Sequence, residues 1–331
     1  MDTIFRLALQ ALLLEGKREP PITDATSPHS RFGAGGDGSI EVRNWQVTDE
    51  FPRNRVLLNA VRSAWLDQAI GMAIWNLRAS NLLSEVEFYN PNAARFSDDH
   101  TTIRAPWGAR LLSGGDTSVV GRAFDLIKRD PQTLRAAVAV FDSLDVAVAS
   151  RDIPCLLSMH FVLRDHKLYL TCFLRSLNPY WVWVYDHFFL TLLLEFGASY
   201  LQVDVGAITY ISSCLVASPS DIPLMQQALA ESEMPALEMP AFAKGAQWSD
   251  LEELSTLEKV LRSNLEATDP ESLSELAWQK AVEAKSLWCS ELLQALAYTY
   301  LARRTKKVPL LPFRCPTWAQ AFAERAAMST R

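Results

Sequence analysis

The chain has 331 residues, of which 49% are hydrophobic and 21% are charged, and its formal net charge is −6. This composition is typical of a folded globular protein and excludes a disordered chain. The negative charge argues against broad nucleic-acid binding, which needs a positive face to displace counterions from phosphates. A chain of this length forms one large domain or two ordinary ones.

The five cysteines form no CxxC pair and no close cluster, and no secretory signal is recognised. An odd number of separate cysteines predicts reduced thiols and a cytoplasmic location. The apolar run over 4–14 contains Arg6 and Gln10 and is too short to span a bilayer, so no membrane partner is expected. The five histidines lack paired ligand spacing, so no metal site is predicted.

The first part of the chain is predicted to alternate helices with strands. In chain order we expect a helix over 3–15, a loop over 19–39, a strand over 39–48, helices over 59–83 and 121–129, and a strand over 135–141. The Gly-rich run over 33–38 lacks the Gly-Lys-Ser/Thr of a P-loop, which favours a turn over a phosphate site.

The stretch over 151–218 is the centre of the chain. Two apolar strands are predicted to form a hairpin across Asp165 and His166, and a helix over 188–200 is so apolar that it should lie in the core. A strand over 205–217 follows. The sequence therefore predicts an α+β fold, with a mostly antiparallel sheet and helices packed on one side.

The character of the sequence changes after residue 218. Helices are predicted over 221–231, 250–265 and 271–304, with charged residues along them. We therefore expect a core over 1–218 and a helical C-terminal extension over 219–331 that packs on this core.

Cys155 is the candidate nucleophile. It follows Pro154 at the start of an apolar strand, where a thiol can face a cleft. A thiolate is both a strong nucleophile and a good leaving group. The alternative is that Cys155 is a small buried hydrophobic residue.

Two further polar positions flank this cysteine in the predicted fold. Arg175 and Ser176 end the next strand, where a guanidinium and a hydroxyl can bind phosphate and lower the pKa of a nearby thiol. A salt bridge at a strand end is the alternative for Arg175. Asp186 precedes the apolar helix, where aspartate is a common helix N-cap.

These residues, in this order and spacing, resemble the core of the thymidylate synthase and deoxycytidylate hydroxymethylase family. Weaker similarity runs from about residue 4 to residue 218. The segments that carry the resemblance are Pro154-Cys155, Arg175-Ser176, Tyr185-Asp186, Phe88-Tyr89-Asn90-Pro91 and Phe96-Ser97-Asp98-Asp99.

The resemblance implies a cytidylate hydroxymethylase that acts on CMP or dCMP. Cys155 would add to carbon-6 of the ring, 5,10-methylenetetrahydrofolate would supply one carbon to carbon-5, and water would end the reaction. Thymidylate synthases have an asparagine at the position of Asp186, which reads the uracil edge. A carboxyl that is protonated, or shares a proton with the ring, can complement cytosine instead.

The resemblance also implies a homodimer and further contacts. Arg135 resembles the second of two arginines that reach a partner's phosphate, the first being Leu134 here. Trp107 takes the place of a tyrosine near the nucleotide. Met72 stands where the family has a catalytic glutamate, and Val216 where it has a residue near the sugar. These departures leave two alternatives open: a non-catalytic partner subunit, or an enzyme of the same fold acting on another substrate in specialised metabolism.

Overall fold

A single sheet is the framework of the protein. The computed structural model describes residues 1–20, 38–59, 61–62, 64–233, 237–239, 241–267, 284 and 287–306. Six strands pair in the order β1-β2-β6-β5-β4-β3, and every pair is antiparallel except β5 with β6. Their bounds are β1 Lys17–Glu19, β2 Ser39–Asp49, β3 Ala137–Ala139, β4 Leu156–Arg164, β5 Lys167–Leu174 and β6 Asp204–Ala217.

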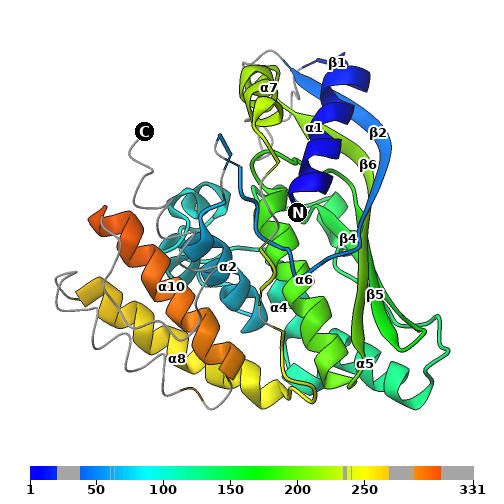
Figure 1. Cartoon of the computed structure of the whole chain (residues 1–331), viewed down its shortest axis with the longest axis vertical. Helices are drawn as coiled ribbons and strands as arrows, with labels where there is room; N and C mark the ends of the chain where they lie inside the picture. Colours follow the sequence, from blue (N-terminus) through cyan, green and yellow to red (C-terminus); the bar gives the residue numbers. More distant parts are fainter. Residues whose placement is uncertain are drawn as a thin grey trace.

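The helices of the described chain lie to one side of this sheet (Figure 1). Their bounds are α1 Asp2–Glu15, α2 Leu66–Leu77, α3 Leu83–Glu87, α4 Trp107–Leu112, α5 Val119–Arg129, α6 Trp183–Tyr200, α7 Ile222–Ala230, α8 Trp248–Ala267 and α10 Leu287–Thr305. The predicted α+β fold, with its mostly antiparallel sheet and packed helices, is confirmed.

The predicted hairpin joins β4 to β5. Asp165 and His166 at its turn have φ values of 50° and 59°. Positive φ at both central residues is the type I′ geometry, whose twist matches that of the flanking strands. Cys155 comes directly before β4, and its carbonyl accepts the N–H of Arg175 at 2.9 Å. The hairpin therefore brings the end of β5 beside the candidate nucleophile.

Helix α6 is buried on all sides between the sheet and α2. It begins at Trp183, earlier than predicted, and Val182 is its N-cap. Asp186 thus lies inside the first turn, and the interpretation of Asp186 as the N-cap is wrong.

One polar residue fixes this buried helix to the sheet. His187 Nδ1 lies 2.8 Å from the Tyr210 hydroxyl, and its Nε2 lies 3.2 Å from Asp49 Oδ2. Burial alone would raise the pKa of Asp49, but the hydrogen bond and charge of His187 lower it to about 2.

One predicted helix starts later than expected, and a second is described only in part. The helix predicted over 59–83 begins at Leu66, because the Asn59 side chain accepts the N–H groups of Val61 and Arg62 and closes a turn. The helix predicted over 271–304 is described from Leu287 onward, and residues 271–283 lie outside the described residues. Residues 33–37 of the Gly-rich run also lie outside them.

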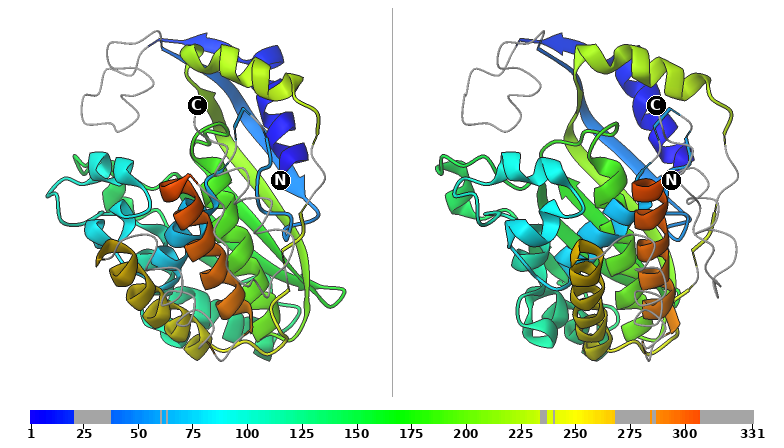
Figure 2. Two further views of the ribbon diagram at one scale, coloured as in Figure 1. Left: turned by 60° about the vertical axis from the view of Figure 1, so that its left-hand side comes forward. Right: turned by 90° about the vertical axis from the view of Figure 1, so that its left-hand side faces the viewer.

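Helices α8 and α10 pack against each other and against α2, as both views of Figure 2 show. A buried charged cluster joins α8 to the core. Glu258 of α8 pairs with Arg78 and Arg262 and accepts the Tyr89 hydroxyl at 2.6 Å. The division into a core over 1–218 and a helical extension over 219–331 that packs on it stays a prediction.

We expect Glu258→Gln to lower the free energy of unfolding by about 3 kcal/mol, because it leaves the buried Arg78 without its full counter-charge. Urea unfolding checks this. Arg43→Gln is the control, since Arg43 is 75% exposed in its pair with Glu19 and should change stability by less than about 1 kcal/mol. Equal effects of the two substitutions would contradict the prediction.

Candidate active site

A cavity of about 430 Å³ lies at the start of α6. Its walls come from α2, from the segment over 90–107, from the loop before β4 and from the first turn of α6. Aromatic and amide side chains dominate the lining, namely Trp65, Trp75, Phe96, Trp107, Trp181, Tyr185 and Phe189 with Gln68, Asn76, Asn90, Asn92 and Asn178. A mostly apolar cavity with a few polar groups is the usual form of a small-molecule site.

The Cys155 thiol borders this cavity and is partly exposed. The Ser176 hydroxyl, which also lines the cavity, lies 3.5 Å from the sulfur and donates to it. A hydroxyl donor stabilises the thiolate form, which is the nucleophilic one.

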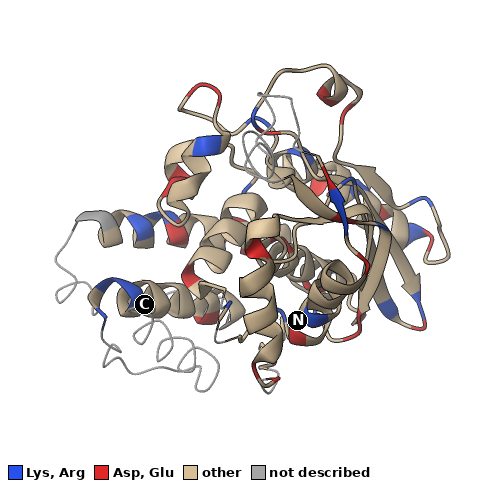
Figure 3. Ribbon diagram, turned by 90° about the horizontal axis from the view of Figure 1, so that it is seen from above, with Lys and Arg blue, Asp and Glu red and all other residues tan. Residues whose placement is uncertain are grey.

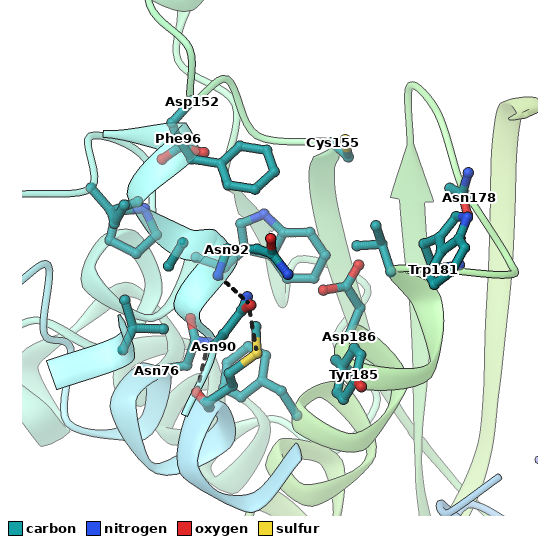
Figure 4. Close-up of a pocket in the computed structure, with 18 of the residues that line it drawn as sticks. Asn76, Asn90, Asn92, Phe96, Asp152, Cys155, Asn178, Trp181, Tyr185 and Asp186 are labelled. Atoms are coloured by element: carbon teal, nitrogen blue, oxygen red, sulfur yellow. Dashed lines mark hydrogen bonds between the residues drawn. The ribbon is translucent and has the colours of Figure 1, made fainter. Parts of the chain in front are cut away.

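Asp186 projects from the first turn of α6 into the same cavity, and Figure 4 shows its carboxyl below Cys155. Burial, and then the neighbouring Cys155, raise the pKa of Asp186 well above its usual range. A protonated carboxyl offers one hydrogen-bond donor and one acceptor. The site thus combines a thiol with a carboxyl whose neutral form is favoured by burial.

The predicted anion-binding arginines lie elsewhere. Arg175 donates from Nε to the Pro154 carbonyl at 3.0 Å and from a terminal nitrogen to the Ile153 carbonyl at 2.9 Å. It therefore holds the loop that carries Cys155 and is not among the cavity-lining residues. Arg135 is exposed just before β3 and is not among them either. Their contact with phosphate stays a prediction.

Two charged residues of the cavity were not assigned from sequence. Arg62 lines the cavity, and its guanidinium donates to the Tyr180 and Trp181 carbonyls. Asp152 lines it beside Phe96 (Figure 4), and its Oδ2 accepts the Ala105 N–H at 2.6 Å. The signal for Asp152 in the sequence was an acidic residue three positions before Cys155.

The residues at the altered family positions line the cavity too. Trp107, Met72 and Val216 are all part of its wall. The Gln68 amide lies 3.6 Å from the Met72 sulfur, so neutral groups surround the position where the resemblance implies a glutamate.

Other kinds of site find no support in the described chain. Within it, no group of three His, Cys, Asp or Glu side chains could hold a metal ion. No helix in the described ranges is long and apolar enough to cross a membrane. Figure 3 shows Lys and Arg interspersed with Asp and Glu along the ribbon.

The raised pKa of Asp186 predicts a pH-dependent stability. Asp186 keeps its proton in the folded protein at pH values where the unfolded chain has released it. The wild type therefore loses stability as the pH rises from the unfolded pKa of Asp186 toward its higher folded pKa. Asp186→Asn has no such proton, and its gain over the wild type should grow by up to about 1.4 kcal/mol per pH unit between about pH 5 and pH 7. Urea unfolding at several pH values measures this.

The control for this experiment is Asp204→Asn. A hydrogen bond and the charge of Lys244 lower the pKa of Asp204, so its replacement should give no stability gain that grows with pH. A gain of Asp186→Asn that stays constant over the pH range would contradict the prediction.

Comparison with known proteins gives a partial likeness, and no family model matches the chain. Over 159 residues it is 27% identical to a deoxyuridylate hydroxymethyltransferase of Bacillus phage SP01, covering 44% of this chain and 42% of the relative. Over 153 residues it is 30% identical to a protein of the same name from Delftia phage PhiW-14, covering 42% of each.

A Methanothermobacter marburgensis protein, provisionally named a thymidylate synthase, is 29% identical over 113 residues, which are 34% of this chain and 50% of that protein. The chain thus spans about two fifths of the length of the phage relatives that it matches. Over that part it is similar to proteins that are named as deoxyuridylate hydroxymethyltransferases or as a thymidylate synthase.

Proposed function

We propose that the protein transfers one carbon from a folate to carbon-5 of a pyrimidine nucleotide, and specifically that it hydroxymethylates CMP or dCMP. The observation that carries this proposal is the placement of Cys155 and Asp186 on one cavity. The likeness to deoxyuridylate hydroxymethyltransferases supports the reaction class.

Cys155 would start the reaction. Carbon-5 of a pyrimidine is a poor nucleophile until a thiolate adds to carbon-6 and pushes electron density onto it. The Ser176 hydroxyl, 3.5 Å from the sulfur, favours the charged thiolate before attack and after its departure.

Asp186 would select the base. Cytosine presents an amine donor and a ring-nitrogen acceptor, and a protonated carboxyl accepts from the first and donates to the second. Uracil presents the opposite pair of groups, with a ring N–H. The phage relatives are named for deoxyuridylate, so the choice of cytosine rests on Asp186 alone.

The walls of the cavity fit a second flat ring. Trp75, Trp107 and Phe96 offer aromatic surfaces, and Asn76 and Asn90 offer amides that can bind the polar edge of a pterin. When bound, 5,10-methylenetetrahydrofolate would supply the carbon at the formaldehyde oxidation level. The chain would hold the two rings against each other and admit the water that completes hydroxymethylation.

The phosphate site is proposed to be shared by two subunits of a homodimer. Arg175 and Ser176 would serve it from one subunit and Arg135 from the other. The sheet supports this, because on the central strand β5 the partly exposed Tyr169, Thr171 and Phe173 alternate with buried residues. Described helices leave that face open (Figure 1). A cytoplasmic location remains part of the proposal.

Tritium release from [5-³H]dCMP or [5-³H]CMP tests the reaction, with [5-³H]dUMP as the competing substrate. The wild type should release tritium from the cytosine nucleotide, and Cys155→Ala should release none. Asp186→Asn should move the preference toward uracil by at least about tenfold, since a site with a mismatched hydrogen bond discriminates strongly.

An unchanged preference in Asp186→Asn would remove the base-reading role. Absence of release from every pyrimidine nucleotide, with ligand binding equal in the wild type and in Cys155→Ala, would favour a non-catalytic partner subunit. That is the second candidate, and Met72 at the glutamate position is the observation that favours it.

The dimer has its own test. Thr171→Glu places a charge at the centre of the open sheet face and should halve the mass measured by sedimentation equilibrium, because a buried unpaired charge is costly at an interface. Lys167→Glu, at the exposed end of the same strand, is the control and should leave the mass unchanged. A wild type that sediments as a monomer would contradict the dimer.

A further inference from the structure

The proposed reaction needs a group that moves the proton on carbon-5, and the cavity offers few. In the described chain the ionisable residues that line it are Arg62, Asp152, Cys155, Tyr185 and Asp186. Arg62 donates to two backbone carbonyls, and the Tyr185 hydroxyl accepts the Trp65 N–H at 3.5 Å. The proposed function already assigns Cys155 as the nucleophile and Asp186 as the group that binds the pyrimidine ring. Asp152 is the remaining carboxyl that lines the cavity, and it has no assigned role.

Asp152 is held firmly at the edge of the cavity. Its Oδ2 accepts the Ala105 N–H at 2.6 Å, which joins the loop before β4 to the segment that carries Trp107. No hydrogen bond to its Oδ1 is found within the described residues, and the side chain lines the cavity. The residue lies on the same short loop as Cys155, beside Phe96, and across the cavity from Trp181 (Figure 4).

The charges around Asp152 suit a proton carrier. Burial raises its pKa, while Arg110 and Arg104 lower it and Asp98 raises it further. Both arginines bind Asp145, at 2.5 Å and 2.6 Å, so neither forms an ion pair with Asp152. A carboxyl whose pKa is raised is better suited to general acid–base catalysis than an ordinary aspartate.

We propose that Asp152 is the catalytic residue that transfers the proton at carbon-5, in place of the glutamate that Met72 replaces. This inference rests on the proposed function. Once Cys155 has added to carbon-6 and carbon-5 has formed a bond to the carbon that the folate would supply, the Asp152 carboxylate takes the carbon-5 proton. Its O–H bond forms as the C–H bond breaks, and the electron pair of the C–H bond stays with the ring carbon.

The same step operates without folate. Protonated Asp152 gives its proton to carbon-5 of the Cys155 adduct, and the carboxylate then removes either of the two hydrogens. The released electron pair restores the double bond between carbon-5 and carbon-6 and expels the Cys155 thiolate. Substrate is recovered with its carbon-5 hydrogen exchanged, and atoms and charge balance.

Asp152→Asn tests the proposal, because the amide oxygen can still accept the Ala105 N–H. Folate-free tritium exchange from the [5-³H] nucleotide that the wild type prefers should fall by at least about 100-fold. The covalent complex with the 5-fluoro analogue and 5,10-methylenetetrahydrofolate, weighed by mass spectrometry, should still form. Fluorine at carbon-5 leaves no proton to remove, so that complex needs Cys155 and not Asp152.

Asp204→Asn is the control. Asp204 pairs with Lys244 and is not among the cavity-lining residues, so its replacement should leave exchange near the wild-type rate.

Unchanged exchange in Asp152→Asn would overturn the proposal. Loss of the 5-fluoro complex together with exchange would also overturn it, because Asp152 would then act only by holding the Ala105 segment. A wild type that gives neither exchange nor complex with any pyrimidine nucleotide would overturn the proposed function itself, and this inference with it.

Discussion

The complete burial of helix α6 is the constraint on which the site depends. Its apolar side chains contact the sheet on one side and α2 on the other, and the contacts of His187 with Tyr210 and Asp49 fix its rotation. Because close packing fixes the position of the helix, it also fixes the position of the first turn. Asp186 is therefore carried into the cavity by packing, and the loss of hydration there explains why its carboxyl favours the neutral form.

The hydrophobic pattern of the sequence was enough to predict the elements that are defined by their own residues. The strands that flank Asp165 are apolar and meet at a polar turn, and most residues of α6 are apolar, so both elements could be found from sequence. The late start of α2 could not, because it depends on which backbone groups the Asn59 side chain binds. Residue order likewise could not show that the Arg175 guanidinium turns back to the Ile153 and Pro154 carbonyls.

The cavity joins two kinds of environment that favour the proposed chemistry. Aromatic walls exclude water and raise the pKa values of both carboxyls, at Asp152 and Asp186. The Cys155 thiol lies at the partly exposed edge, where Ser176 can stabilise its charge. In the proposed reaction, neutral groups would face the flat rings of the ligand. The negative charge of the Cys155 thiolate would develop at the edge of the cavity, where water can reach it.

The support that α8 and α10 give to α2 has a consequence for how this site can evolve. Met72 and Asn76 of α2 line the cavity. Arg78, the residue that follows α2, forms an ion pair with Glu258 of α8. A change in the packing of these outer helices would tilt α2 and reshape the cavity wall without altering any ligand contact. For the proposed enzyme, substrate range could thus diversify through the remote C-terminal helices while Cys155 and Asp186 stay constant.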